Sequence, residues 1–183
     1  SNLVNCITYH YAASSTDAAG NSTLAGDATL TTRGCAGDAD VSSENASFFT
    51  SSAGGTVSLI DDGTGVALSV PPLFATQDAH FQLKKLDKTA ALDALGVPST
   101  YQTVGDYVYD MHALSDVQTA ISIFDAPLSV TMHYNAANIS GTDESSLRIF
   151  RNDDSIWTPL DGCSINKPAR SITCATSHFS TFS

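Results

Sequence analysis

The chain has 183 residues, with 8 lysines and arginines against 19 aspartates and glutamates, which gives a formal net charge of −11. Such an acidic surface repels phosphate backbones and anionic lipid headgroups, so we expect neither nucleic acid nor an acidic membrane surface as a partner. No apolar run approaches the length of about eighteen residues that a membrane-spanning helix needs, so the sequence predicts no membrane span.

The first 54 residues form a segment of low apolar content. They contain strand-like runs at residues 3–11 and 29–32, separated by turns rich in small residues. Because so few apolar side chains cannot build an independent core, we expect residues 1–54 to be an N-terminal strand extension that packs on the rest of the chain. Gly54-Gly55 is the predicted boundary, and residues 55–183 are predicted to form one domain.

A hairpin opens this second segment. Apolar residues alternate with small or polar ones on both sides of the turn at residues 61–65, whose Asp-Asp-Gly-Thr-Gly sequence is typical of a tight connection. A strand is predicted over residues 81–86. It leads into the only predicted helix, residues 88–95, with Asp87 as its N-cap and Gly96 just past its end.

Short strands continue to the end of the chain. They are predicted at residues 101–104, 107–111, 120–124, 128–134, 147–150, 156–159 and 171–182. Many short strands separated by turns about every ten residues are typical of two packed antiparallel sheets. The predicted fold class is therefore all-β, an antiparallel two-sheet β-sandwich with one short helix.

The four cysteines are Cys6, Cys35, Cys163 and Cys174. None belongs to a C-x-x-C pair, which disfavours zinc ribbons and thioredoxin-like redox sites. Three disulfide connectivities are possible, and we favour local pairing of Cys6 with Cys35 and of Cys163 with Cys174. Four buried thiols in a cytosolic protein are the alternative. Disulfides favour an extracellular or cell-surface location for a secreted protein.

The C-terminal stretch carries a family resemblance. It contains Trp157, Gly162-Cys163, Thr173-Cys174 and the final run 178–182, His-Phe-Ser-Thr-Phe. This pattern resembles the GPS motif of GAIN domains and the related end of ZU5 domains, which are β-sandwich modules of cell-surface proteins. Segments 65–72, 124–130 and 147–150 resemble strands of ZU5-like modules, so the resemblance covers roughly residues 55–183. Thr176 departs from the GPS pattern, which has a cysteine there.

The resemblance implies that the final strand can cut itself between Phe179 and Ser180. The Ser180 hydroxyl would attack the carbonyl of Phe179, the acyl group would move from nitrogen to oxygen, and water would hydrolyse the ester. A serine hydroxyl needs a base, and His178 is the candidate. The step also needs a distorted peptide and donors for the oxyanion. In an ordinary strand, by contrast, Phe179 would lie in the core with His178 and Ser180 on the opposite face.

The function that we expect is that of a non-catalytic structural or adhesion module of an extracellular or cell-surface protein, not a turnover enzyme. Its partners would be other protein modules or copies of itself. A self-cleaving processing module is one alternative, and a subunit of an extracellular filament or surface layer assembling through sheet edges is another. Carbohydrate binding through aromatic residues stays open. We expect no cofactor and no metal site, although acidic turns such as Asp61-Asp62 leave a calcium ion open.

Overall fold

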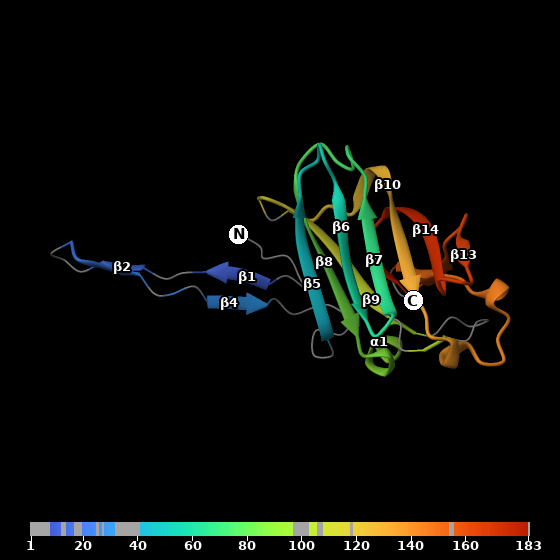
Figure 1. Ribbon diagram of the computed structural model, residues 1–183. Coiled ribbons are helices and arrows are strands. Elements are labelled where there is room, and N and C mark those ends of the chain that lie inside the picture. Colours follow the sequence, from blue (N-terminus) through green and yellow to red (C-terminus); the bar gives the residue numbers. More distant parts are fainter. Residues whose placement is uncertain are drawn as a thin grey trace.

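The computed structural model (Figure 1) describes residues 8–11, 14–16, 20–24, 26, 28–31, 41–96, 103–105, 108–117, 119–153 and 156–182. Its main body consists of a five-stranded sheet in the order β13-β14-β10-β7-β6 and a six-stranded sheet in the order β12-β11-β15-β9-β8-β5. All neighbouring strands in both sheets are antiparallel. The predicted fold class, an antiparallel two-sheet β-sandwich with one short α-helix, is confirmed for the described residues.

The bounds of the elements are as follows. The five-stranded sheet contains β6 (Gly55–Asp61), β7 (Thr64–Val70), β10 (Ile123–His133), β13 (Ser164–Asn166) and β14 (Ser171–His178). The six-stranded sheet contains β5 (Val41–Phe49), β8 (Ala79–Leu86), β9 (Tyr109–Ser115), β11 (Phe150–Asp153), β12 (Ile156–Pro159) and β15 (Thr181–Phe182). The helical segments are α1 (Lys88–Leu95) and the short 3-10 turns η1 (Ala136–Ile139) and η2 (Glu144–Ser146).

The predicted hairpin and helix are both present. β6 and β7 pair along their whole length, and Asp62 and Gly63 in the turn between them have φ angles of 46° and 74°. Two successive left-handed residues give the turn a twist that matches the twist of the strands. α1 begins after Asp87, whose carboxylate accepts a hydrogen bond from the backbone N–H of Ala90 at 3.0 Å.

Several predicted strands differ from those observed. Two strands were expected, at residues 120–124 and 128–134. The structure has the single strand β10 from Ile123 to His133, whose register shifts between Ile123 and Leu128. This irregularity accommodates Pro127, which cannot donate to a regular ladder. The strand expected at 107–111 begins at Tyr109 and runs to Ser115, and the described residues 103–105 are not in a strand.

β11 likewise begins at Phe150, three residues after the expected start at 147, and extends to Asp153. β5 and β13 were not predicted at all. Both are short of apolar residues, so neither has the alternation by which a strand is recognised in sequence.

β5 changes where the sandwich begins. It is an edge strand of the six-stranded sheet and pairs with β8 from Val41 to Phe49. In terms of sheet membership the sandwich therefore begins at Val41, whereas the boundary drawn from sequence lay at residue 54. The sequence of β5 is mostly polar because one of its faces meets solvent, and Phe49 is its main contact with the core.

The core between the sheets is centred on Phe81 of β8, which is fully buried. Its ring centroid lies 5.2 Å from that of Phe74, 5.9 Å from that of Phe124 and 5.8 Å from that of Phe179. Phe49 adds a fourth ring at 5.5 Å. Aromatic pairs at such separations stabilise a core beyond the apolar area that they bury.

Four short strands before β5 form two further ladders. β1 (Thr8–Tyr11) pairs with β4 (Ala28–Thr31), and β2 (Ser14–Thr16) pairs with β3 (Ser22–Leu24). Neither ladder joins a sheet of the sandwich. Figure 1 shows them, in blue, extending away from the sandwich as a two-stranded arm. We call these two ladders the arm.

Candidate functional site

Residues 178–180, which the sequence marked as a possible cleavage site, lie where the chain crosses between the sheets. β14 ends at His178 in the five-stranded sheet, and β15 begins at Thr181 in the six-stranded sheet. The expectation of one continuous strand over residues 171–182 is therefore wrong. The reason is tertiary: Phe179 enters the core, where it is 6% exposed, and its N–H donates to the Ser122 carbonyl at 3.0 Å.

The His178 backbone is fixed by a neighbouring hydroxyl. The Thr176 Oγ1 atom accepts from the His178 N–H at 3.2 Å and donates to the His178 carbonyl at 2.8 Å. The His178 side chain is 37% exposed, yet its Nδ1 atom is buried, so the exposure belongs to the other ring atoms. This arrangement directs one ring nitrogen into the protein and leaves the rest of the ring near solvent.

The buried ring nitrogen faces a carboxylate on the other sheet. His178 Nδ1 lies 3.6 Å from Oδ1 of Asp153 in β11, an ion-pair distance rather than a hydrogen bond. The second carboxylate oxygen, Oδ2, accepts from the Arg151 Nε atom at 2.7 Å. Asp153 thus has one basic partner on each oxygen. An Arg-x-Asp pattern in a strand places both side chains on one face, and this is the sequence signal by which the site could have been found.

Ser180 is half-buried and follows Phe179 directly. Within the described part of the chain, no hydrogen bond joins its hydroxyl to the His178 ring. Neither Phe179 nor Ser180 adopts a left-handed backbone; among the described non-glycine residues, those with positive φ are Asp62, Leu73 and Arg170. The structure thus brings His178 together with Asp153 rather than with Ser180. For Ser180 to attack, the other ring nitrogen of His178, Nε2, would have to approach the Ser180 hydroxyl.

A second polar cluster lies just after the crossing. The Thr181 hydroxyl donates to Oδ1 of Asp110 at 3.3 Å, and His112 Nε2 lies 2.6 Å from Oδ2 of the same carboxylate. Asp110 is only 6% exposed, and in the ladder it stands opposite both Thr181 and Lys84. A buried carboxylate needs such partners because an unpaired buried charge is costly.

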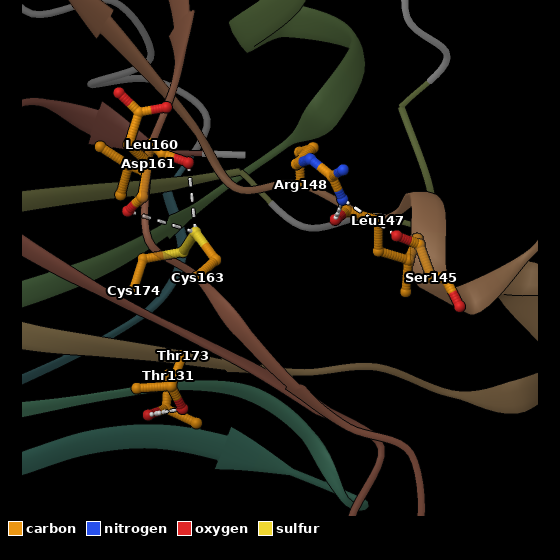
Figure 2. The surroundings of a disulfide bond; sticks show 9 residues. All are labelled: Thr131, Ser145, Leu147, Arg148, Leu160, Asp161, Cys163, Thr173 and Cys174. Atoms are coloured by element: carbon orange, nitrogen blue, oxygen red, sulfur yellow. Dashed lines mark hydrogen bonds between the residues drawn. A yellow bond between two sulfur atoms is a disulfide. The ribbon is translucent and has the colours of Figure 1, made fainter.

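The Cys163–Cys174 disulfide is present, as the spacing of these cysteines predicted. Its Cα atoms are 4.3 Å apart, and it ties the start of β13 to the middle of β14 (Figure 2). The Cys163 sulfur also lies 3.2 Å from the Leu160 carbonyl oxygen. Cys6 and Cys35 lie outside the described residues, so nothing is stated about their pairing.

The other candidates from sequence are dispersed. Among the residues that the structure describes, no three His, Cys, Asp or Glu side chains are grouped as a metal site would need. Of the aromatic residues considered for carbohydrate, Tyr109 is buried in the core, and Trp157 is half-buried and donates from Nε1 to the Gly96 carbonyl at 2.9 Å. Tyr101 and Tyr107 lie outside the described residues.

Comparisons with protein-family models, with curated proteins and with solved structures found no match. The resemblance to ZU5 and GAIN modules therefore rests on the sequence patterns within residues 55–183 alone. None of the helices in the described ranges has the length and apolar character required to cross a membrane.

Proposed function

We propose that this chain is a non-catalytic structural or adhesion module of an extracellular or cell-surface protein, in which the arm contacts neighbouring molecules. The observation that carries the proposal is the arm itself. In the described part of the chain its strands form ladders with each other and extend away from the sandwich (Figure 1). An isolated two-stranded ribbon is marginally stable in water, so contact with a second surface would stabilise it.

An extracellular location is supported by the Cys163–Cys174 disulfide, since disulfides persist in oxidising compartments. In one version of this proposal the chain is a subunit of a filament or surface layer. The arm of one molecule would then bind a sheet edge of the next molecule. β5 and β12 end the six-stranded sheet, and β6 and β13 end the five-stranded sheet. Edge strands present unpaired backbone groups that a neighbouring chain can use.

The test is removal of residues 1–40, which leaves every strand of the sandwich in place because β5 begins at Val41. Sedimentation and light scattering would compare the assembly state of the two proteins over a range of concentrations. We expect large, open-ended assemblies of the whole chain and their loss in the shortened protein, with the unfolding transition of the sandwich retained. Identical assembly behaviour of both proteins would contradict a role of the arm in self-assembly.

Self-processing is the second candidate function. It is favoured by the position of Asp153, whose Oδ1 lies 3.6 Å from His178 Nδ1. A carboxylate that closed to hydrogen-bond distance of Nδ1 would favour the tautomer whose Nε2 can accept a proton. The scissile bond would be that between Phe179 and Ser180. Denaturing electrophoresis and intact mass of the protein with an affinity tag after Ser183 would reveal a cleaved fragment that begins at Ser180. Loss of that fragment in Ser180→Ala would support cleavage, and an intact chain after prolonged incubation would exclude it.

A further inference from the structure

A row of polar side chains crosses the outer face of the six-stranded sheet. The ladder registers place Asp110 of β9 opposite Thr181 of β15, and Thr181 opposite Asn152 of β11. Lys84 of β8 continues the row on the other side of Asp110. Phe182, which follows Thr181, lies in the core, so the row lies on the opposite face of the sheet. We call these four polar residues the polar row.

The polar row is buried, although it lies on the outer face of its sheet. Lys84 is 2% exposed, Asn152 4% and Asp110 6%. Trp157, which stands opposite Asn152 in the ladder, donates from its indole Nε1 to the backbone carbonyl at the end of α1, so the helix end reaches this part of the sheet. Buried polar groups need hydrogen-bond partners or have a chemical role, and a site that holds little water slows competing hydrolysis.

Asp110 holds the Thr181 hydroxyl. The Thr181 Oγ1 atom donates to Oδ1 of Asp110 at 3.3 Å, and Oδ2 of the same carboxylate lies 2.6 Å from Nε2 of His112. With a proton on Nε2, the imidazole donates to Oδ2 and fixes the orientation of the carboxylate, which leaves Oδ1 directed at the hydroxyl. A carboxylate in contact with a hydroxyl is the arrangement of a base beside a nucleophile.

Asn152 supplies an electrophilic carbon on the other side of Thr181. Residues directly opposite each other in antiparallel strands have Cβ atoms about 4.5–5.5 Å apart. The threonine hydroxyl oxygen and the asparagine amide carbon are each one bond from Cβ, so rotation about the two χ1 angles can bring them into contact. Base, hydroxyl and amide thus follow one another on the adjacent strands β9, β15 and β11.

We propose that Thr181 and Asn152 form an ester that cross-links β15 to β11. Asp110 takes the proton of Oγ1 as this oxygen bonds to Cγ of Asn152, and it returns the proton to the amide nitrogen, which leaves as ammonia. A C–O bond and an N–H bond form while an O–H bond and a C–N bond break, so the reaction needs no oxidant and no further reactant. It occurs once in each chain, so the proximity of groups held by the folded sheet is sufficient for a slow reaction.

The cross-link would secure a very short strand. β15 has only two residues, and it is held between β9 and β11 by two ladder pairs on each side. A covalent bond from Thr181 to β11 would keep this strand in the sheet when heat or force opens the ladder. The inference depends neither on the arm nor on the function proposed above.

The test is the intact mass of the reduced and denatured chain after prolonged incubation of the folded protein. We expect a mass lower than that of the sequence by one ammonia. Trypsin cuts after Arg151 and after Arg170, so Asn152 and Thr181 fall in different peptides. Once the disulfide is reduced, a peptide pair that stays joined would locate the ester, and mild alkali should separate the pair.

Variants of the polar row identify the reacting groups. Thr181→Val removes the nucleophile and Asp110→Asn removes the base, so both should have their full sequence mass, whereas Thr181→Ser should still lose ammonia. Thr131→Val is the matched control, because the half-buried Thr131 hydroxyl bonds to that of Thr173 in the other sheet. It should lose ammonia like the unaltered chain. Circular dichroism and thermal unfolding would verify the fold of each variant.

Two results would overturn the proposal. The first is an unaltered chain that keeps its full sequence mass, which needs no variant to interpret. The second is a loss of ammonia that persists in Thr181→Val, because an asparagine can also lose ammonia by cyclising onto the backbone. In that case the tryptic peptides would separate on reduction alone.

Discussion

The Nδ1 atom of His178, the last residue of β14, lies 3.6 Å from Oδ1 of Asp153 in β11, so this pair joins the two sheets beside the crossing of the chain. The same carboxylate accepts from Arg151 at 2.7 Å. Because these side chains are about one-third exposed, solvent screens much of the attraction. We expect Asp153→Asn to lower the free energy of unfolding by about 0.5–1 kcal/mol, measured by urea denaturation.

The matched control is Asp116→Asn. Asp116 lies 3.5 Å from His80, but its side chain is 64% exposed. We expect no measurable change in its unfolding midpoint. If Asp153→Asn and Asp116→Asn changed the free energy of unfolding equally, the contact between His178 and Asp153 would add no more stability than an exposed pair.

The Cys163–Cys174 disulfide closes a short loop, with a sequence separation of 11. In the chain-entropy model a loop of this size restricts the unfolded chain enough to contribute about 3 kcal/mol. We expect the double variant Cys163→Ser/Cys174→Ser to lose about that much free energy of unfolding in guanidinium titrations under oxidising conditions. Under reducing conditions the difference from the unaltered chain should vanish, and a difference that persists would point to packing of the sulfurs instead.

Phe81 contacts the rings of four other phenylalanines and is fully buried. Phe81→Ala should lower the free energy of unfolding by about 3–5 kcal/mol, because it removes apolar contacts and leaves a cavity. Phe48→Ala is the control on the neighbouring strand, since Phe48 is 46% exposed and its ring has a tilted contact with that of His80. Thermal unfolding followed by near-ultraviolet circular dichroism would separate the two variants.

Gly63 lies in the turn between β6 and β7, and Gly65 is the second residue of β7. Both have positive φ angles, of 74° and 144°. A Cβ atom at position 65 would collide with the Leu59 carbonyl oxygen, whereas one at position 63 would meet no atom within 4 Å. We expect Gly63→Ala to lower the free energy of unfolding by about 1 kcal/mol, because alanine disfavours this backbone conformation. Gly65→Ala should lower it clearly more, because the two strands of the hairpin must also move apart to admit the Cβ atom. Equal unfolding midpoints of the two variants would contradict this expectation.

Burial raises the pKa of the Tyr134 phenol above its usual value of 10.0, and the Glu144 carboxylate raises it further. Folding therefore favours the neutral phenol. Its contribution to stability is fully present below pH 10.0 and is lost as the pH rises from there through the raised pKa of the folded state. The free energy of unfolding of the unaltered chain should fall more steeply above that pH than that of Tyr134→Phe. Parallel curves would rule out this phenol as the cause.

Local sequence patterns were sufficient to predict the elements that are determined by residues close together in the chain. The Asp-Asp-Gly-Thr-Gly turn identified the β6–β7 hairpin, and Asp87 and Gly96 delimited α1, because turn and cap conformations depend on residues a few positions apart. The pairing of Cys163 with Cys174 followed from their proximity in the chain. Repeated short strands then fixed the all-β class.

The tertiary structure alone decided the rest. β15 has only two residues, and its place between β9 and β11 depends on ladder partners far away in the chain, so nothing near Thr181 indicates the crossing. β5 is a strand because β8 pairs with it, although its own residues are mostly polar. The contact of His178 with Asp153 also depends on tertiary structure, because Asp153 lies on the other sheet. The sequence by itself determined the class of the fold and its local turns, while the meeting of side chains across the sheets required the long-range pairing of strands, which no local pattern encodes.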